Sequence, residues 1–152
     1  MTTKRSGFTL TEIMVVIAII GVIMAVSAPR IASVRDRTNL RAARDEIASA
    51  LATARSAAVQ KGVTSNFFAT RDSVQVKLGT GQQIMPVRPL RDMYGAAVTV
   101  VDPTDTLISY DTRGLATRTS TSAATFRVTV GSLSDSVCVS RLGLVTKLGC
   151  LK

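Results

Sequence analysis

The residue with the most unusual chemical setting is Glu12, a carboxylate at the start of an uncharged apolar run, Ile13 to Val26. A charge inside a bilayer costs about 2.5–3.5 kcal/mol on insertion scales, so it usually has a partner or a function. No Lys or Arg lies between Arg5 and Arg30. A cationic partner would therefore come from another chain or from a newly made amino terminus. The alternative is that Glu12 lies at the membrane interface and keeps its carboxylate in water.

The other polar residues do not form a recognisable catalytic set. The chain has no histidine, which removes the commonest general base. Gly79-Thr80-Gly81 is a lone pair of glycines, typical of a turn and not of a phosphate-binding loop. The carboxylates of the second half mostly flank expected turns, where Asp forms local hydrogen bonds; they are Asp72, Asp92, Asp102, Asp105, Asp111 and Asp135. We therefore expect no enzyme activity, no cofactor and no metal site.

The apolar run is the one candidate for a membrane span in the sequence. From Phe8 to Ala28 it has about 21 residues, or about 31 Å of helix, which matches a bilayer core. The leader, residues 1–7, carries Lys4 and Arg5, and the positive-inside rule places it in the cytoplasm. A cleaved secretory signal ending at Ala25-Val26-Ser27 is the alternative. The length of the run and the carboxylate at its start argue against that alternative.

The stretch Ser6-Gly7-Phe8-Thr9-Leu10-Thr11-Glu12, between a basic leader and an apolar run, resembles the class III signal of type IV pilins and pseudopilins. The resemblance implies that a prepilin peptidase cleaves after Gly7 and N-methylates the new first residue, Phe8. It also implies that Glu12 is the essential assembly glutamate and that Pro29 kinks the helix. A neighbouring subunit's Glu12 could then pair with the new ammonium of Phe8, which would fix subunit register in a filament.

Hydrophobic periodicity divides the chain into one long helix and a strand-rich remainder. We expect a helix from about residue 8 to residue 60, with residues 8–28 in the membrane and residues 29–62 continuing it as an amphipathic segment. The apolar stripe of this continuation consists of Leu40, Ala43, Ile47, Ala50, Leu51, Ala54 and Ala58. Residues 63–152 read as antiparallel strands, with a loop at 79–93 and a connection at 115–124. The predicted fold class is α+β, a helix packed on antiparallel sheets.

Two cysteines, Cys138 and Cys150, would face the periplasm in this topology. Disulfides persist there, and a bond closing a loop of about a dozen residues stabilises a protein by about 3 kcal/mol in the chain-entropy model. A zinc site is the alternative, but two thiols without histidine make a poor zinc shell. We therefore predict a Cys138–Cys150 disulfide.

The strand-rich half resembles the H-type minor pseudopilins and the related FimT minor pilins. The resemblance lies in three stretches, residues 51–58, 108–114 and 137–145. It implies a structural subunit of a type II secretion pseudopilus or of a type IV pilus. The expected partners are prepilin peptidase, other pilins in a filament and an inner-membrane assembly platform. The expected location is the bacterial inner membrane, with a cytoplasmic N-terminus and a periplasmic C-terminal domain.

A second hypothesis is a minor pilin that binds DNA during uptake. The net charge of +9 suits an anionic partner, although it also fits a solvated basic surface. Some FimT proteins bind DNA through a C-terminal Gly-Arg-x-Arg stretch; here the matching residues, 143–147, lack both arginines. Arg141, Lys147 and Lys152 remain as possible phosphate contacts. A membrane-anchored enzyme is a third reading, for which the sequence offers no site.

Overall fold

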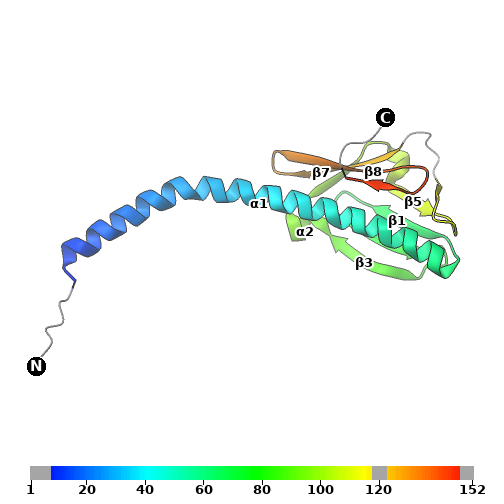
Figure 1. Cartoon of the computed structure of the whole chain (residues 1–152), viewed down its shortest axis with the longest axis horizontal. Helices are drawn as coiled ribbons and strands as arrows, with labels where there is room; N and C mark the ends of the chain where they lie inside the picture. The colour runs from blue at the N-terminus through cyan, green and yellow to red at the C-terminus, as the bar shows by residue number, and fades with distance from the viewer. Residues whose placement is uncertain (1–7, 118–122, 148–152) are drawn as a thin grey trace, which may run out of the picture. The chain divides into compact units, whose positions relative to one another are not determined.

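The computed structural model describes residues 8–117 and 123–147, without the side chains of residues 26–30, 104 and 105. The chain divides into two compact units, Met1–Arg35 and Asp36–Lys152. The first unit holds the start of helix α1, and the second holds the rest of α1 together with all the strands (Figure 1).

Helix α1 runs from Leu10 to Lys61, 52 residues, close to the predicted bounds. It ends at Gly62, whose φ of 62° is a left-handed conformation that glycine adopts without steric cost. Pro29 lies inside α1, so the helix continues past it as expected; the predicted kink there stays a prediction. Over the described residues, the structure contains no helix with both the length and the apolar character needed to cross a membrane.

The first sheet has five strands in the order β3-β2-β1-β5-β6, all antiparallel. Its elements are β1 (Ser65–Ala69), β2 (Ser73–Leu78), β3 (Gln83–Pro89), β5 (Leu107–Tyr110) and β6 (Ala116–Thr117). Strands β1 and β2 form a hairpin and pair from Ser65↔Leu78 to Ala69↔Val74, in agreement with the predicted antiparallel strands. Inward and outward side chains alternate along both strands, as expected for a sheet with one face on the core.

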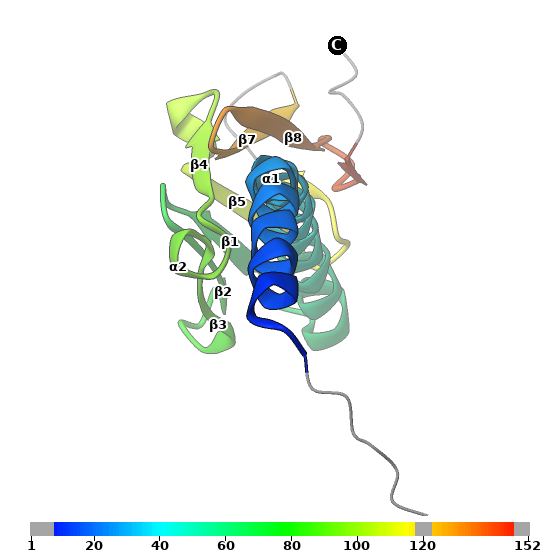
Figure 2. The same cartoon turned by 90° about the vertical axis from the view of Figure 1, so that its left-hand side faces the viewer.

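The second sheet has four antiparallel strands in the order β4-β7-β8-β9. They are β4 (Ala97–Val100), β7 (Ala124–Val130), β8 (Leu133–Val139) and β9 (Val145–Thr146). The 3₁₀ turn η1 (Pro103–Thr106) connects β4 to β5 of the other sheet. Figure 2 shows β1, β2 and β3 beside the second half of α1, with β7 and β8 across it. This arrangement confirms the predicted α+β class.

The core lies between the 36–61 part of α1 and the inner faces of both sheets. The predicted apolar stripe of α1 is buried along its whole length, with Ile47, Leu51 and Ala54 fully inaccessible. Phe67 of β1 and Phe126 of β7 meet edge to face, with ring centroids 5.4 Å apart and an interplanar angle of 79°. This contact joins the first sheet to the second through the centre of the core.

The expected loop at residues 79–93 is wrong, because most of it forms strand β3 and the short helix α2 (Leu90–Tyr94). Pro86 and Pro89 indicated a loop, yet proline is tolerated on an edge strand, where its missing N–H is not needed for pairing. Strand β3 is such an edge, and its register with β2 is interrupted twice. Helix α2 buries Leu90 completely and ends at Gly95, whose φ is 65°.

Candidate functional site

The predicted processing site lies at the start of the described chain. Gly7 lies outside the described residues, and the side chain of Phe8 is 80% exposed. Thr9 caps α1: the backbone N–H of Glu12 donates to its hydroxyl (3.3 Å) and to its carbonyl oxygen (3.1 Å). Thr9-x-x-Glu12 therefore has the spacing of a capping box, in which residue N3 is Glu or Gln. An exposed phenylalanine directly before a capped helix is sterically open to a processing enzyme.

The helix that follows presents an apolar surface with few polar interruptions. Its large aliphatic side chains between Ile13 and Met24 are 45–67% exposed. A monomer in water rarely exposes so much contiguous apolar surface, so this surface requires lipid or other apolar helices around it. Glu12, in the first turn of α1, lies at the N-terminal end of this apolar surface.

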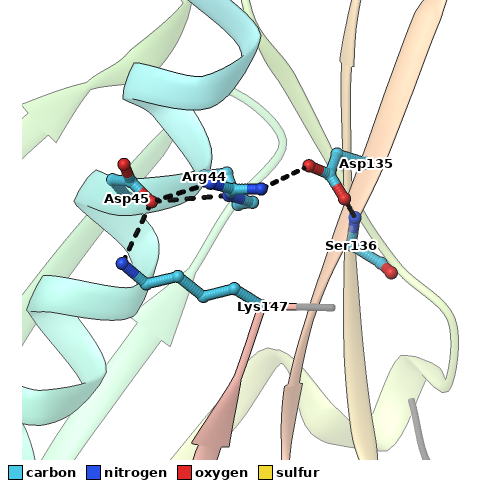
Figure 3. A network of polar contacts seen from close by, with 5 residues as sticks. All are labelled: Arg44, Asp45, Asp135, Ser136 and Lys147. Atoms are coloured by element: carbon cyan, nitrogen blue, oxygen red, sulfur yellow. Dashed lines mark hydrogen bonds and ion pairs between the residues drawn. The ribbon is translucent and has the colours of Figure 1, made fainter. Parts of the chain in front are cut away.

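A cluster of charges lies where α1 meets the second sheet (Figure 3). Arg44 donates from Nη1 to Oδ2 of Asp135 on β8 at 2.9 Å, and its Nη2 lies 3.3 Å from Oδ1 of Asp45. Lys147, just after β9, places its Nζ 3.1 Å from the same oxygen of Asp45. The side chain of Arg44 is only 18% exposed, so its bond to Asp135 is the most sheltered of the three. The cluster ties β8 and the end of β9 to the helix.

The Lys147 ammonium, hydrogen-bonded to Asp45, holds the pKa of that carboxyl below its ordinary 3.8, although partial desolvation opposes the shift. The stabilisation linked to this shift is present above the unfolded pKa and is lost as the pH falls through the lower, folded pKa. We expect Lys147→Ala to raise the pKa of Asp45 towards 3.8, measured by NMR titration of its carboxyl. Lys77→Ala removes the same charge on β2 and serves as the control; an unchanged Asp45 pKa in Lys147→Ala would contradict the pairing.

The described residues that were predicted to contact DNA do not form a continuous row of unpaired positive charges. Arg141 is exposed in the turn between β8 and β9, Lys147 is paired with Asp45, and Lys152 lies outside the described residues. The charge of Lys147 is thus shared with a carboxylate that would repel phosphate. Arg141 lies in the β8–β9 turn and accepts a backbone hydrogen bond from Ala116, whereas Lys147 follows β9 and pairs with Asp45, so the two residues have different neighbours.

Cys138 lies on β8, is almost fully buried and is disulfide-bonded. Cys150, the other cysteine of the chain, lies outside the described residues, so the predicted Cys138–Cys150 pairing stays a prediction. Cys138 lies opposite Thr125 in the β7–β8 pair, so its disulfide is attached to the second sheet.

Two arginines at the margin of the apolar stripe of α1 make specific contacts with the strand-rich part of the chain. Arg44 reaches Asp135, and Nε of Arg55 donates to the carbonyl oxygen of Gly114 at 3.0 Å. Both arginines lie four positions after a buried leucine, Leu40 and Leu51, at the margin of the apolar stripe. This spacing was the sequence signal for the two contacts, because a residue at i+4 lies on the same helix face as residue i.

Residues 2–28 match a family model described as the prokaryotic N-terminal methylation motif. Two crystal structures of the type IV minor pilin FimU from Pseudomonas aeruginosa (strain PAO1) match the fold. One has a TM-score of 0.59 at 17% identity and covers 74% of this chain and 90% of the FimU chain. The other, in a different space group, has a TM-score of 0.55 at 17% identity and covers 72% and 93%. No curated protein matches the chain. The chain therefore begins with a prokaryotic N-terminal methylation motif and has, over about three quarters of its length, a fold similar to that of the type IV minor pilin FimU.

Proposed function

We propose that the protein is a structural subunit of a pilus or pseudopilus, cleaved by prepilin peptidase after Gly7 and N-methylated on Phe8. Residues 8–28 then serve first as the anchor in the bacterial inner membrane and later as the helix that packs in the filament. Residues 29–62 continue this helix, and they and the strand-rich domain, residues 63–152, face the periplasm. The observation that carries the proposal is that the N-terminal methylation motif, residues 2–28, contains the uncharged and exposed apolar stretch from Ile13 to Met24.

The proposal covers two machines, the pseudopilus of type II secretion and the type IV pilus. The fold supports both, because a helix packed on antiparallel sheets leaves the apolar half available for assembly in either filament. Neighbouring genes for a secretin and a secretion ATPase would favour the pseudopilus. Neighbouring pilus and competence genes would favour the pilus. Other pilins and an inner-membrane assembly platform are the expected partners in both.

Processing is the direct test of the proposal. Co-expressed with a prepilin peptidase, the chain is expected to lose residues 1–7 and gain one methyl group on Phe8, as measured by intact-mass spectrometry. Gly7→Leu is expected to leave the chain uncleaved, because a bulky side chain replaces the hydrogen at the cleavage position. Expression without the peptidase is the control. A chain cleaved after Ser27, or one that keeps Met1 beside active peptidase, would refute the proposal.

DNA binding remains the alternative function, and the exposed Arg141 and the net charge of +9 support it. Such binding would rest on phosphate contacts and would weaken steeply with salt. A salt titration of duplex DNA against the full chain in micelles separates the two functions. Affinity lost in Arg141→Ala but kept in Arg127→Ala, an exposed arginine on β7, would support it. Absence of binding at low salt would exclude it.

A further inference from the structure

Three exposed arginines follow the apolar stretch of α1 in the sequence. They are Arg35, Arg37 and Arg41, here called the arginine collar. In the described part of the chain, no ion pair or hydrogen bond joins another side chain to any of them. Arg37 and Arg41 are four positions apart and share a helix face, where two like charges repel each other. This arrangement favours an anion supplied from outside the chain.

The carboxylates of the same helix are directed elsewhere. From residue 13 to residue 61 they are Asp36, Asp45 and Glu46. Asp36 is half-buried, and its Oδ2 lies beside the β7–β8 turn, 3.5 Å from the position of a Cβ on Gly131. Asp45 and Glu46 form ion pairs with basic residues of the strand-rich domain, at 3.1 Å and 3.3 Å. The negative charge that matches the arginine collar would therefore come from a partner.

Aliphatic side chains are mixed with the arginine collar. Ile31 and Val34 are 66% and 62% exposed. Val34, Arg37 and Arg41 recur at i, i+3 and i+7 along α1, so they lie on one face of the helix. A partner for this face combines negative charge with an apolar layer, which a phospholipid surface does. A duplex nucleic acid presents its phosphates without such a layer beneath them.

The position of the arginine collar along the helix agrees with contact to headgroups. A headgroup layer extends about 5–8 Å beyond the hydrocarbon core on each side. At about 1.5 Å per residue, Arg35 and Arg37 lie about 11 Å and 14 Å beyond residue 28, and Arg41 about 20 Å. Long side chains on a helix lean towards its N-terminus, here back towards the apolar stretch. Arg35 and Arg37 can therefore place their guanidinium groups in the headgroup layer, with Arg41 at its outer margin.

We propose that the arginine collar binds the headgroups of anionic phospholipids in the leaflet that the strand-rich domain faces. The guanidinium groups would pair with lipid phosphates, to which arginine can donate two hydrogen bonds at once. Ile31 and Val34 would enter the apolar side of the same interface. The contact would hold each subunit at a fixed depth until it is drawn into a filament. The inference rests on the proposed function, because it requires the preceding helix to lie in a bilayer.

The test uses the full-length chain in detergent micelles that contain either phosphatidylglycerol or phosphatidylcholine. Native mass spectrometry counts the lipid molecules that each chain retains. We expect phosphatidylglycerol to bind at least about tenfold more tightly, because each arginine near an anionic surface strengthens binding about fivefold. Arg35→Gln/Arg37→Gln/Arg41→Gln should abolish this preference while keeping good helix formers in place. Arg41→Gln alone should lower the preference less than Arg35→Gln alone, because Arg41 stands farther from the bilayer.

Arg113→Gln/Arg127→Gln/Arg141→Gln is the matched control, since it removes the same charge from exposed positions of the strand-rich domain. It should leave the preference for phosphatidylglycerol unchanged. Glycerol 3-phosphate, a soluble phosphate without acyl chains, should not displace the lipid. Ile31→Ser/Val34→Ser should weaken retention of phosphatidylglycerol without unfolding the chain, because both side chains are exposed.

Equal retention of the two lipids by the unaltered chain would overturn the inference. An equal loss of preference in the control variant would overturn it too, because the charge would then act from anywhere on the surface. Displacement of phosphatidylglycerol by duplex DNA at the same phosphate concentration would assign the arginine collar to nucleic acid instead. Cleavage after Gly7 reports separately on the proposed function, so a processed chain without a lipid preference refutes the headgroup contact alone.

Discussion

Phe126→Ala is expected to lower the free energy of unfolding by about 3–5 kcal/mol, because it empties the centre of the core. The ring of Phe126 is fully buried on β7 and packs edge to face on Phe67 of β1. Its loss removes the contact between the two sheets and leaves a cavity that rigid strands cannot close. Urea unfolding of the full chain in micelles, followed by circular dichroism, measures the change.

Phe68→Ala is the matched control for this prediction. Phe68 lies on the outer face of β1, partly exposed, with the ammonium of Lys77 5.9 Å from its ring centroid. Its truncation should cost less than about 1 kcal/mol, since it removes a surface contact only. Equal losses of unfolding free energy in Phe126→Ala and Phe68→Ala would mean that the contact between Phe67 and Phe126 contributes no more to stability than a surface contact does.

If Glu12 pairs with the ammonium of Phe8 in a neighbouring subunit, as we propose, Glu12→Ala is expected to reduce incorporation into filaments by at least about tenfold, because that ammonium would then be unpaired in an apolar setting. The measurement is the fraction of the chain found in sheared filaments of the native host, relative to the fraction left in the membrane. Processing after Gly7 is followed in the same samples, so a failure of cleavage is not mistaken for a failure of assembly.

Glu12→Gln separates the charge from the helix cap. Glutamine can occupy the third position of a capping box as glutamate does, but it carries no charge. If Glu12 acts by pairing with an ammonium, Glu12→Gln should fail as Glu12→Ala fails. Normal incorporation of Glu12→Gln would assign Glu12 to capping the helix that begins after Thr9.

The extent to which sequence could predict this fold depended on how regular each pattern was. The apolar stripe of α1 and the alternation in β1, β2 and β7 follow the helical and strand periods closely, and these elements lie in the parts of the sequence expected to be helical and strand-rich. Strand β3 lacks such alternation and contains two prolines, so its pairing with β2 became visible only in three dimensions.

The candidate sites show the same division. The N-terminal methylation motif is local, spanning residues 2–28, so it could be recognised from the start of the sequence alone. The junction of Gly114 with Gly143 brings together two turns almost thirty positions apart, and no local pattern announces it. The Arg44–Asp135 bond likewise joins residues 91 positions apart. Contacts of this kind depend on how strands are ordered in the two sheets, which periodicity does not encode.

The two prolines of β3 affect how strands of neighbouring copies can pair. Strand β3 is the outer strand of the five-stranded sheet, and an unprotected outer strand can recruit a strand from a neighbouring molecule. Pro86 and Pro89 lack the N–H that such recruitment needs, and the two register breaks bend the strand away from a flat template. In the membrane-anchored subunit that we propose, these features would limit cross-β pairing between neighbouring copies before they enter a filament.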